Sequence, residues 1–205
     1  MARSVSVFVI SSFVVSGQVG LKAMMPALRA LQLETVSLPT TILSAHPAAF
    51  PNQGPPVSTP QTPEQMLAAA DWLLAAGALD DCAAVITGYL PSTAHIAAAR
   101  RLKPAHLVVT SAPAPPERIA TLSVADHVLR CETACAPQAP HGMGYCFAAL
   151  YVGLYLKGEA KALGIACASL AQMANQNMQT AQLPHGPVVL AQPALTDKLA
   201  DKPTG

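Results

Sequence analysis

An almost unbroken run of strand-forming residues near the amino end restricts the fold more than any other feature of this chain. Residues 4–10 hold Val5 and then four consecutive apolar residues, Val7–Ile10. A strand with one solvated face alternates apolar and polar residues, whereas a strand covered on both faces does not. We therefore predict an α/β protein with a mostly parallel central sheet and helices on both faces.

Strand-like and helix-like segments alternate along the rest of the chain, which favours βαβ units. Further strands are expected at residues 34–38, 82–90 and 106–111, with a β-hairpin or meander within 119–130. Helices are expected at about residues 21–31, 63–76, 92–103, 145–158 and 159–179. The pattern predicts one α/β domain over residues 1–183, followed by a C-terminal tail at residues 184–205.

A proline-rich segment at residues 47–63 interrupts the alternation. A loop of this length is usually functional or disordered, so it is either a flap over a ligand or a surface excursion. Its end is defined by a helix start, because Thr62 is a favourable N-cap residue and Pro63 suits the first helical position. Gln65, three residues after Thr62, completes the pattern of a capping box.

Composition excludes several classes of function. Of the 205 residues, 52% are hydrophobic and 11% are charged, and the formal net charge is +1. This balance gives no electrostatic basis for binding nucleic acid. No apolar run reaches the roughly 20 residues that span a bilayer, and the first residues do not form a signal peptide. The low charge content is compatible with surface covered by a second subunit.

The five cysteines are odd in number and scattered, which argues against a disulfide framework. We expect thiols and a cytoplasmic location. Cys131 and Cys135 lie near His127 and His141, but their spacing is not that of a metal site, and no metal ligands are predicted. The remaining histidines show no partner pattern and are interpreted as ordinary surface or boundary residues: His95, His106 and His185.

Polar residues follow each predicted strand, where ligands bind in open α/β sheets. These clusters are Ser11-Ser12, His46, Gly88-Tyr89 and Thr110-Ser111. Each has a structural alternative: Ser12 as a turn cap, Tyr89 as a core residue with a satisfied hydroxyl, and His46 as an exposed loop residue.

The turn Gly142-Met143-Gly144 precedes a long apolar helix pattern. Two glycines one residue apart at a helix start let backbone N–H groups converge, and the helix N-terminus adds partial positive charge. The arrangement suits a phosphate or a developing anion. The alternative is a tight turn into a packed helix.

Several short blocks, in order along the chain, resemble the pyridoxal kinases of the ribokinase-like superfamily. The blocks are Ile10–Gly20, Leu38–His46, Val85–Ser92, Val108–Pro113 and Pro140–Leu150. The resemblance implies a ribokinase-like fold and ATP-dependent phosphorylation of the 5′-hydroxymethyl group of pyridoxal or pyridoxine, with Mg²⁺ as the metal. This is a transferase reaction of vitamin B6 metabolism, and family members are commonly homodimers.

The resemblance also implies roles for particular residues. Substrate contacts fall on Ser12, His46, Pro47 and Tyr89, and nucleotide contacts fall on Thr110 and Ser111. The catalytic anion hole falls on Gly142, Met143, Gly144 and Tyr145.

The chain departs from the family pattern in ways that predict impaired turnover. Tyr145 stands where the family has the aspartate that acts as general base, and a tyrosine is mostly a hydrogen-bond donor at neutral pH. A central segment that supports Mg²⁺ and ATP in the family is missing between residues 103 and 106. Phe13, Leu21 and Ala45 also replace polar family residues, and Pro47 replaces a threonine. The alternatives are a non-catalytic ligand-binding or structural remnant and a kinase acting on hydroxymethylpyrimidine.

Overall fold

The computed structural model describes residues 6–50, 52–100, 107–112, 118–124, 128–134 and 141–177. Only the backbone is described at residue 100, in 107–112 and 118–124, at 128, 133 and 134, and in 175–177. The chain forms two compact units, Met1–Lys103 and Pro104–Gly205. The extent of the single domain expected over residues 1–183 stays a prediction.

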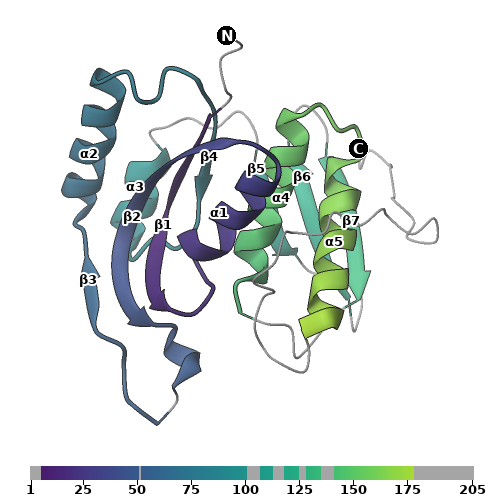
Figure 1. Ribbon diagram of the computed structural model, residues 1–205, viewed down its shortest axis with the longest axis horizontal. Helices are drawn as coiled ribbons and strands as arrows, with labels where there is room; N and C mark the ends of the chain where they lie inside the picture. The colour runs from purple at the N-terminus through teal and green to yellow at the C-terminus, as the bar shows by residue number, and fades with distance from the viewer. Residues whose placement is uncertain are drawn as a thin grey trace. The chain divides into compact units, whose positions relative to one another are not determined.

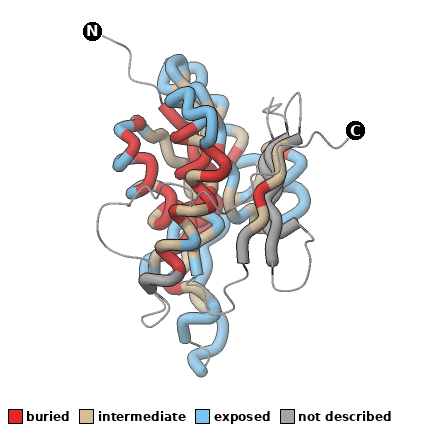
Figure 2. The backbone as a smooth tube through the Cα atoms, turned by 90° about the vertical axis from the view of Figure 1, so that its right-hand side faces the viewer, coloured by how far each residue is buried: buried red, intermediate tan, exposed pale blue. Residues whose placement is uncertain are grey.

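The first unit is built on a four-stranded, mostly parallel sheet (Figure 1), as predicted. Its strands are β1 (Ser6–Ser16), β2 (Glu34–Ala45), β3 (Ser58–Pro60) and β4 (Cys82–Thr87), in the order β3-β2-β1-β4. β1 pairs in parallel with β2 and β4, and β3 runs antiparallel to β2. The first seven residues of β1 are buried (Figure 2), as the unalternated apolar run requires.

Helices cover both faces of this sheet. α1 (Leu21–Ala30) packs against β1 and β2, and its Met24 and Leu28 are fully buried. α2 (Pro63–Ala75) and α3 (Thr93–Arg100) contribute Met66 and Ala98 to a cluster with residues of the sheet. The sheet residues in that cluster are Phe8, Ile10 and Leu38. Since alternate strand residues point to opposite faces, Val7 and Val9 lie on the other side.

The proline-rich segment contains regular secondary structure. It begins with the short 3₁₀ helix η1 (Pro47–Ala49) and returns along β2 as β3. The capping box at its end is confirmed, because the Thr62 hydroxyl accepts from the Gln65 N–H at 3.2 Å. In return, the Thr62 N–H donates to Gln65 Oε1 at 2.8 Å. The start of α2 is thus set by local sequence.

The second unit contains a three-stranded antiparallel sheet and two helices. Its elements are β5 (Leu107–Ala112), β6 (Arg118–Val124), β7 (Val128–Ala134), α4 (Met143–Leu156) and α5 (Ala162–Asn177). β6 and β7 form the predicted hairpin. The strand expected at residues 106–111 is β5, and it pairs antiparallel with β6 in this second sheet. An apolar run predicts a strand but not its pairing partner.

α4 is apolar on all sides, and it packs against α5. Phe147 stacks on Tyr151 with ring centroids 6.0 Å apart, and Cys146 Sγ lies 4.0 Å from Met173 Sδ. Burial raises the pKa of the Cys146 thiol to about 11. The four described cysteines are thiols and not disulfides, as expected: Cys82, Cys131, Cys146 and Cys167.

The buried Cys146 thiol predicts a loss of stability in alkali. An unfolded thiol ionises near pH 9 and the folded one near pH 11, so the folded chain holds one more proton between these values. The free energy of unfolding is expected to fall by about 1.4 kcal/mol per pH unit in that window. Urea unfolding at pH 8, 9 and 10 measures the slope, and Cys146→Ala should remove this part of it. An equal slope in both proteins would contradict the assignment.

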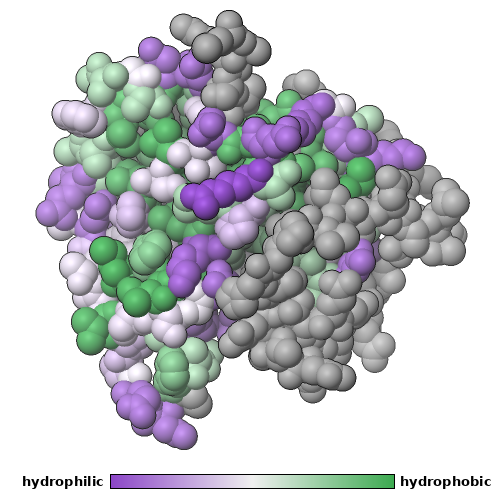
Figure 3. Space-filling model, in the orientation of Figure 1, coloured by the Kyte–Doolittle hydropathy of each residue, from purple (hydrophilic) through white to green (hydrophobic). Residues whose placement is uncertain are grey.

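Large apolar side chains also reach the surface of the first unit, and Figure 3 shows apolar and polar residues interspersed over the face in view. Trp72, Leu74 and Val57 are the most exposed of them. Among the described residues, no helix is both long enough and apolar enough to cross a bilayer.

Candidate functional site

The segment that follows β4 is bonded to the middle of β1, next to the predicted substrate residue Ser12. The Gly88 N–H donates to the Ile10 carbonyl at 2.8 Å, which extends the pairing of β4 with β1 by one residue. The next N–H, that of Tyr89, donates to the Ser11 hydroxyl at 3.2 Å. Ser11 is fully buried, while the Tyr89 side chain is 47% exposed. The core alternative for Tyr89 is therefore wrong.

A β-bulge in β2 brings a third strand to the same place. Ser11 pairs with Pro39 and Phe13 with Ile42, so two residues of β2, Thr40 and Thr41, stand opposite one residue of β1. Side chains of a regular strand alternate between faces, but both threonines are buried here. The Thr40 hydroxyl donates to the Tyr89 carbonyl at 2.8 Å, whereas the Thr41 hydroxyl lies 2.9 Å from Ser58 Oγ.

Ser12 is buried within β1, where it lies against Gly20 at the start of α1. Gly20, the N-cap residue of α1, forms an isolated bridge with Phe13 and has a φ of 60°. A Cβ atom at Gly20 would overlap the Ser12 carbonyl and stand 2.6 Å from Ser12 Oγ. Only glycine meets both conditions, so the pattern Gly17-x-x-Gly20 has a structural reason.

His46 and Pro47 lie farther along the sheet than Tyr89. The register pairs Ala45 with Ser16, five residues beyond Ser11 and as much as about 16 Å along the strand. His46 is half-buried and caps η1, because its Nδ1 accepts from the Ala48 N–H at 3.3 Å. Pro47 is exposed. Tyr89 is bonded to Ser11, the neighbour of Ser12, whereas His46 and Pro47 follow the far end of β2.

His95 is a residue that the sequence interpretation missed. It is buried rather than a surface residue, and both ring nitrogens have partners. Nε2 lies 2.9 Å from the Gln61 carbonyl, and Nδ1 lies 2.8 Å from Ser92 Oγ. Because a carbonyl only accepts, Nε2 carries a hydrogen. The pattern Ser92-x-x-His95 at a helix start was the available signal, but nothing in the sequence indicates Gln61.

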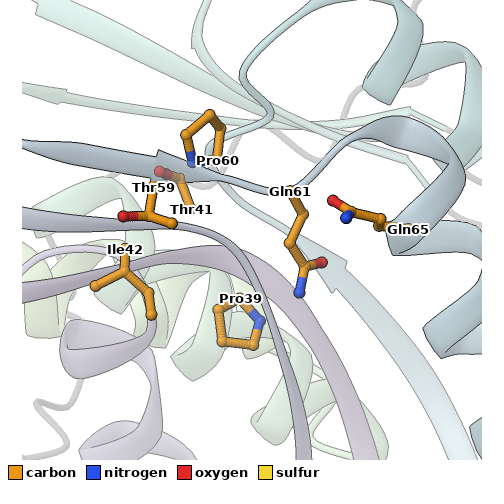
Figure 4. A pocket seen from close by; sticks show the side chains of 7 residues that line it. All are labelled: Pro39, Thr41, Ile42, Thr59, Pro60, Gln61 and Gln65. Atoms are coloured by element: carbon orange, nitrogen blue, oxygen red, sulfur yellow. The ribbon is translucent and has the colours of Figure 1, made fainter.

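A groove of about 510 Å³ lies beside the bulge, between β2, β3 and the start of α2 (Figure 4). Its lining residues are Pro39, Thr41, Ile42, Thr59, Pro60, Gln61 and Gln65. None of the predicted site residues is among them. Gln61 Oε1 is buried and has no hydrogen-bond partner among the described residues.

In the second unit, the turn Gly142-Met143-Gly144, predicted as an anion site, begins helix α4. Gly142 is the N-cap residue of α4 with a φ of 99°, in the left-handed region that favours glycine. The Cys146 N–H donates to the Gly142 carbonyl at 3.0 Å, so the earlier N–H groups, such as those of Met143 and Gly144, have no acceptor within the helix. No acidic residue occupies the first turn, and no side chain caps it. The turn therefore fits a phosphate group.

Tyr145 is the third residue of α4 and is half-buried. Thr110 and Ser111 lie in β5, but their side chains are outside the described residues. Among the described residues, no group of three His, Cys, Asp or Glu side chains is arranged to hold a metal ion.

Comparison with known proteins shows what kind of fold this is. No protein-family model matches the sequence, and no curated protein matches it. Solved structures do match. Pyridoxal kinase from Trypanosoma brucei is similar with a TM-score of 0.72 and 17% identity, over 95% of this chain and 97% of the other.

Two further similar structures contain bound small molecules. A phosphomethylpyrimidine kinase from Bacteroides thetaiotaomicron, crystallised with pyridoxal, has a TM-score of 0.64 and 15% identity, over 86% of this chain and 88% of the other. Pyridoxal kinase from Leishmania donovani, in complex with ADP and pyridoxine, has a TM-score of 0.63 and 17% identity, over 85% and 87%. At these identities the likeness establishes the fold, and the chain has the ribokinase-like fold of the pyridoxal and phosphomethylpyrimidine kinases.

Proposed function

We propose that this protein binds a B6 vitamer such as pyridoxal and phosphorylates its 5′-hydroxymethyl group from ATP, with impaired turnover. One observation carries the proposal. Just after β4, the backbone of Tyr89 is bonded to Ser11 of β1 and to Thr40 of β2, and its ring is left exposed. An aromatic ring held in this way offers a stacking surface and a hydroxyl to a small heteroaromatic ligand. The similar structures with pyridoxal or pyridoxine support this choice of ligand.

The other proposed substrate contacts are Ser12, His46 and Pro47. Ser12 directly follows Ser11, the residue that holds the Tyr89 N–H. Pro47 begins the proline-rich segment and His46 directly precedes it, and we propose that this segment acts as the flap over the bound vitamer. Thr110 and Ser111 are proposed nucleotide contacts, on the strength of the family resemblance alone.

The turn at Gly142, Met143 and Gly144 is the proposed phosphate site. Its backbone N–H groups and the helix dipole stabilise negative charge on a phosphoryl group. Transfer also requires a base, because the attacking hydroxymethyl oxygen must lose its proton. Tyr145 occupies the position of that base in the family pattern, and a phenol, with an ordinary pKa of about 10, is a poor base at pH 7. This is why impaired turnover is proposed.

The role of Tyr89 can be tested by binding. We expect Tyr89→Ala to raise the dissociation constant for pyridoxal about five- to tenfold, because an aromatic contact is lost. Tyr155→Ala is the matched control, since Tyr155 is comparably exposed, at 52%, but lies on α4. Titration calorimetry measures both. No binding by the unmodified chain, or equal effects of the two substitutions, would reject the proposed vitamer site.

A second candidate function is vitamer or phosphate binding without catalysis. Tyr145 at the base position and the lack of a metal-binding cluster in the described residues favour it. The two functions differ in their response to ATP, because a ligand of the native state must raise the melting temperature. A kinase should show this rise with millimolar Mg²⁺–ATP and should form pyridoxal phosphate, however slowly. A binding protein should form no product.

We also propose a cytoplasmic location and a homodimer. The free thiols of the described cysteines support a reducing compartment. The low charge content and exposed apolar residues such as Trp72 support surface that a second copy covers.

A further inference from the structure

Four hydrogen bonds connect five residues of the first unit, and the chain segment from Tyr89 to Ser92 closes the circuit. Thr40 donates its hydroxyl hydrogen to the Tyr89 carbonyl at 2.8 Å, and the Thr40 carbonyl accepts from the Gln61 N–H at 2.9 Å. The Gln61 carbonyl accepts from His95, and His95 bonds Ser92, three residues after Tyr89. We call Thr40, Gln61, His95, Ser92 and Tyr89 the Tyr89 circuit.

The members of the circuit come from separate elements. Thr40 lies in the β2 bulge, Gln61 lies between β3 and α2, and His95 lies in α3. Thr40 and His95 are buried, so their hydrogen bonds are shielded from competition by water. A buried hydroxyl or imidazole that loses its hydrogen-bond partner lowers the stability of the fold. The bonds of the circuit are therefore expected to form and break together.

The circuit and Ser11 together determine where the Tyr89 ring can point. The N–H of Tyr89 belongs to the peptide plane before its Cα atom, and the carbonyl belongs to the plane after it. Ser11 holds the first plane and Thr40 holds the second, so both φ and ψ of Tyr89 are restrained. The direction of its Cα–Cβ bond is then fixed, and only the side-chain torsions remain free.

We propose that Thr40 and His95 are positioning residues for ligand recognition, acting through the backbone of Tyr89 and not by contact with the ligand. This inference rests on the proposed vitamer site at Tyr89. It extends that proposal because neither residue belongs to the set of substrate contacts suggested by the sequence.

The matched pair of buried threonines in the bulge provides the test. Thr40→Val keeps the shape and removes the hydroxyl that bonds Tyr89, whereas Thr41→Val removes a hydroxyl that faces Ser58. Hydrogen exchange followed by mass spectrometry reports the opening of residues 88–92 without any ligand, and calorimetry reports pyridoxal binding. Thr40→Ser, which restores the hydroxyl, is the rescue variant.

We expect Thr40→Val to speed exchange in residues 88–92 and to weaken pyridoxal binding, each about five- to tenfold, as for loss of one hydrogen bond. Thr40→Ser should restore both, and Thr41→Val should change both less than about twofold at a similar loss of stability. His95→Phe should act in the same direction as Thr40→Val. Ser11→Ala, which removes the other restraint on Tyr89, replaces Thr40→Val if that variant does not fold.

The results separate the two proposals. Unchanged exchange in Thr40→Val, or equal effects of Thr40→Val and Thr41→Val, would overturn the positioning role. Faster exchange with unchanged pyridoxal affinity would also overturn it. If the unmodified chain does not bind pyridoxal, the proposed function fails, and with it the recognition role, while the exchange data still show whether the circuit holds the turn.

Discussion

Replacing Tyr145 with aspartate is expected to raise the rate of ATP-dependent pyridoxal phosphate formation about 10²–10⁴-fold, the usual contribution of a positioned general base. The residue lies in the first turn of α4, directly after the glycines that present backbone N–H groups. A carboxylate there is ionised at neutral pH and can accept the proton of the hydroxymethyl group. Product formation is followed by the absorbance of pyridoxal phosphate, with Mg²⁺ and ATP supplied.

Tyr145→Asn is the control, since its amide has the size of aspartate but accepts no proton at neutral pH. The aspartate should also leave the fold intact, because an acidic residue in the first turn of a helix stabilises it by about 0.3–1 kcal/mol. If the unmodified protein already turns over rapidly, or if the aspartate and asparagine variants have equal rates, Tyr145 is not what limits the reaction.

Gly20→Ala is expected to lower the free energy of unfolding by about 2–5 kcal/mol. A residue with a Cβ atom at this positive φ destabilises the fold by about 1–2 kcal/mol. The overlap of that Cβ with Ser12 adds an overpacking cost of about 1–3 kcal/mol. Gly54→Ala isolates the first contribution, because Gly54 has a φ of 73° and nothing lies within 4 Å of its added Cβ. Urea unfolding of the two variants measures the difference.

A loss in Gly20→Ala no greater than that in Gly54→Ala would show that the turn after β1 relaxes around a methyl group. The close approach of α1 to Ser12 would then be adjustable and not a fixed part of the site. A difference of about 2 kcal/mol instead would establish that the start of α1 and the end of β1 are held as one rigid turn.

Local patterns were sufficient for much of the fold. The apolar run of β1, the capping box at Thr62 and the hairpin of β6 and β7 are each defined by residues close together in the chain. The pairing of β5 was not predictable in this way. Its apolar residues suit either sheet, and the choice depends on which strand edge lies beside it.

Local patterns also indicate some residues of the candidate site, but not the contacts between distant segments that hold them. Ser12, Tyr89 and the Gly142 turn could be found from strand ends and glycine spacing. The bonds that hold Tyr89 join residues 49 and 78 positions apart, and His95 bonds a backbone carbonyl 34 positions away. Every residue has a backbone carbonyl, so no pattern of side chains in the sequence predicts such a contact.

The extra residue in β2 has a consequence for how a sheet like this can change over time. Before Ser11 the strands keep one register, and after Phe13 they keep another. Gain or loss of a single codon at Thr40–Thr41 would therefore shift Ile42–Ala45 relative to β1 and leave the pairing before Ser11 as it is. In the proposed vitamer site, such a change of length would move His46 and Pro47 relative to Tyr89 without any substitution in the core.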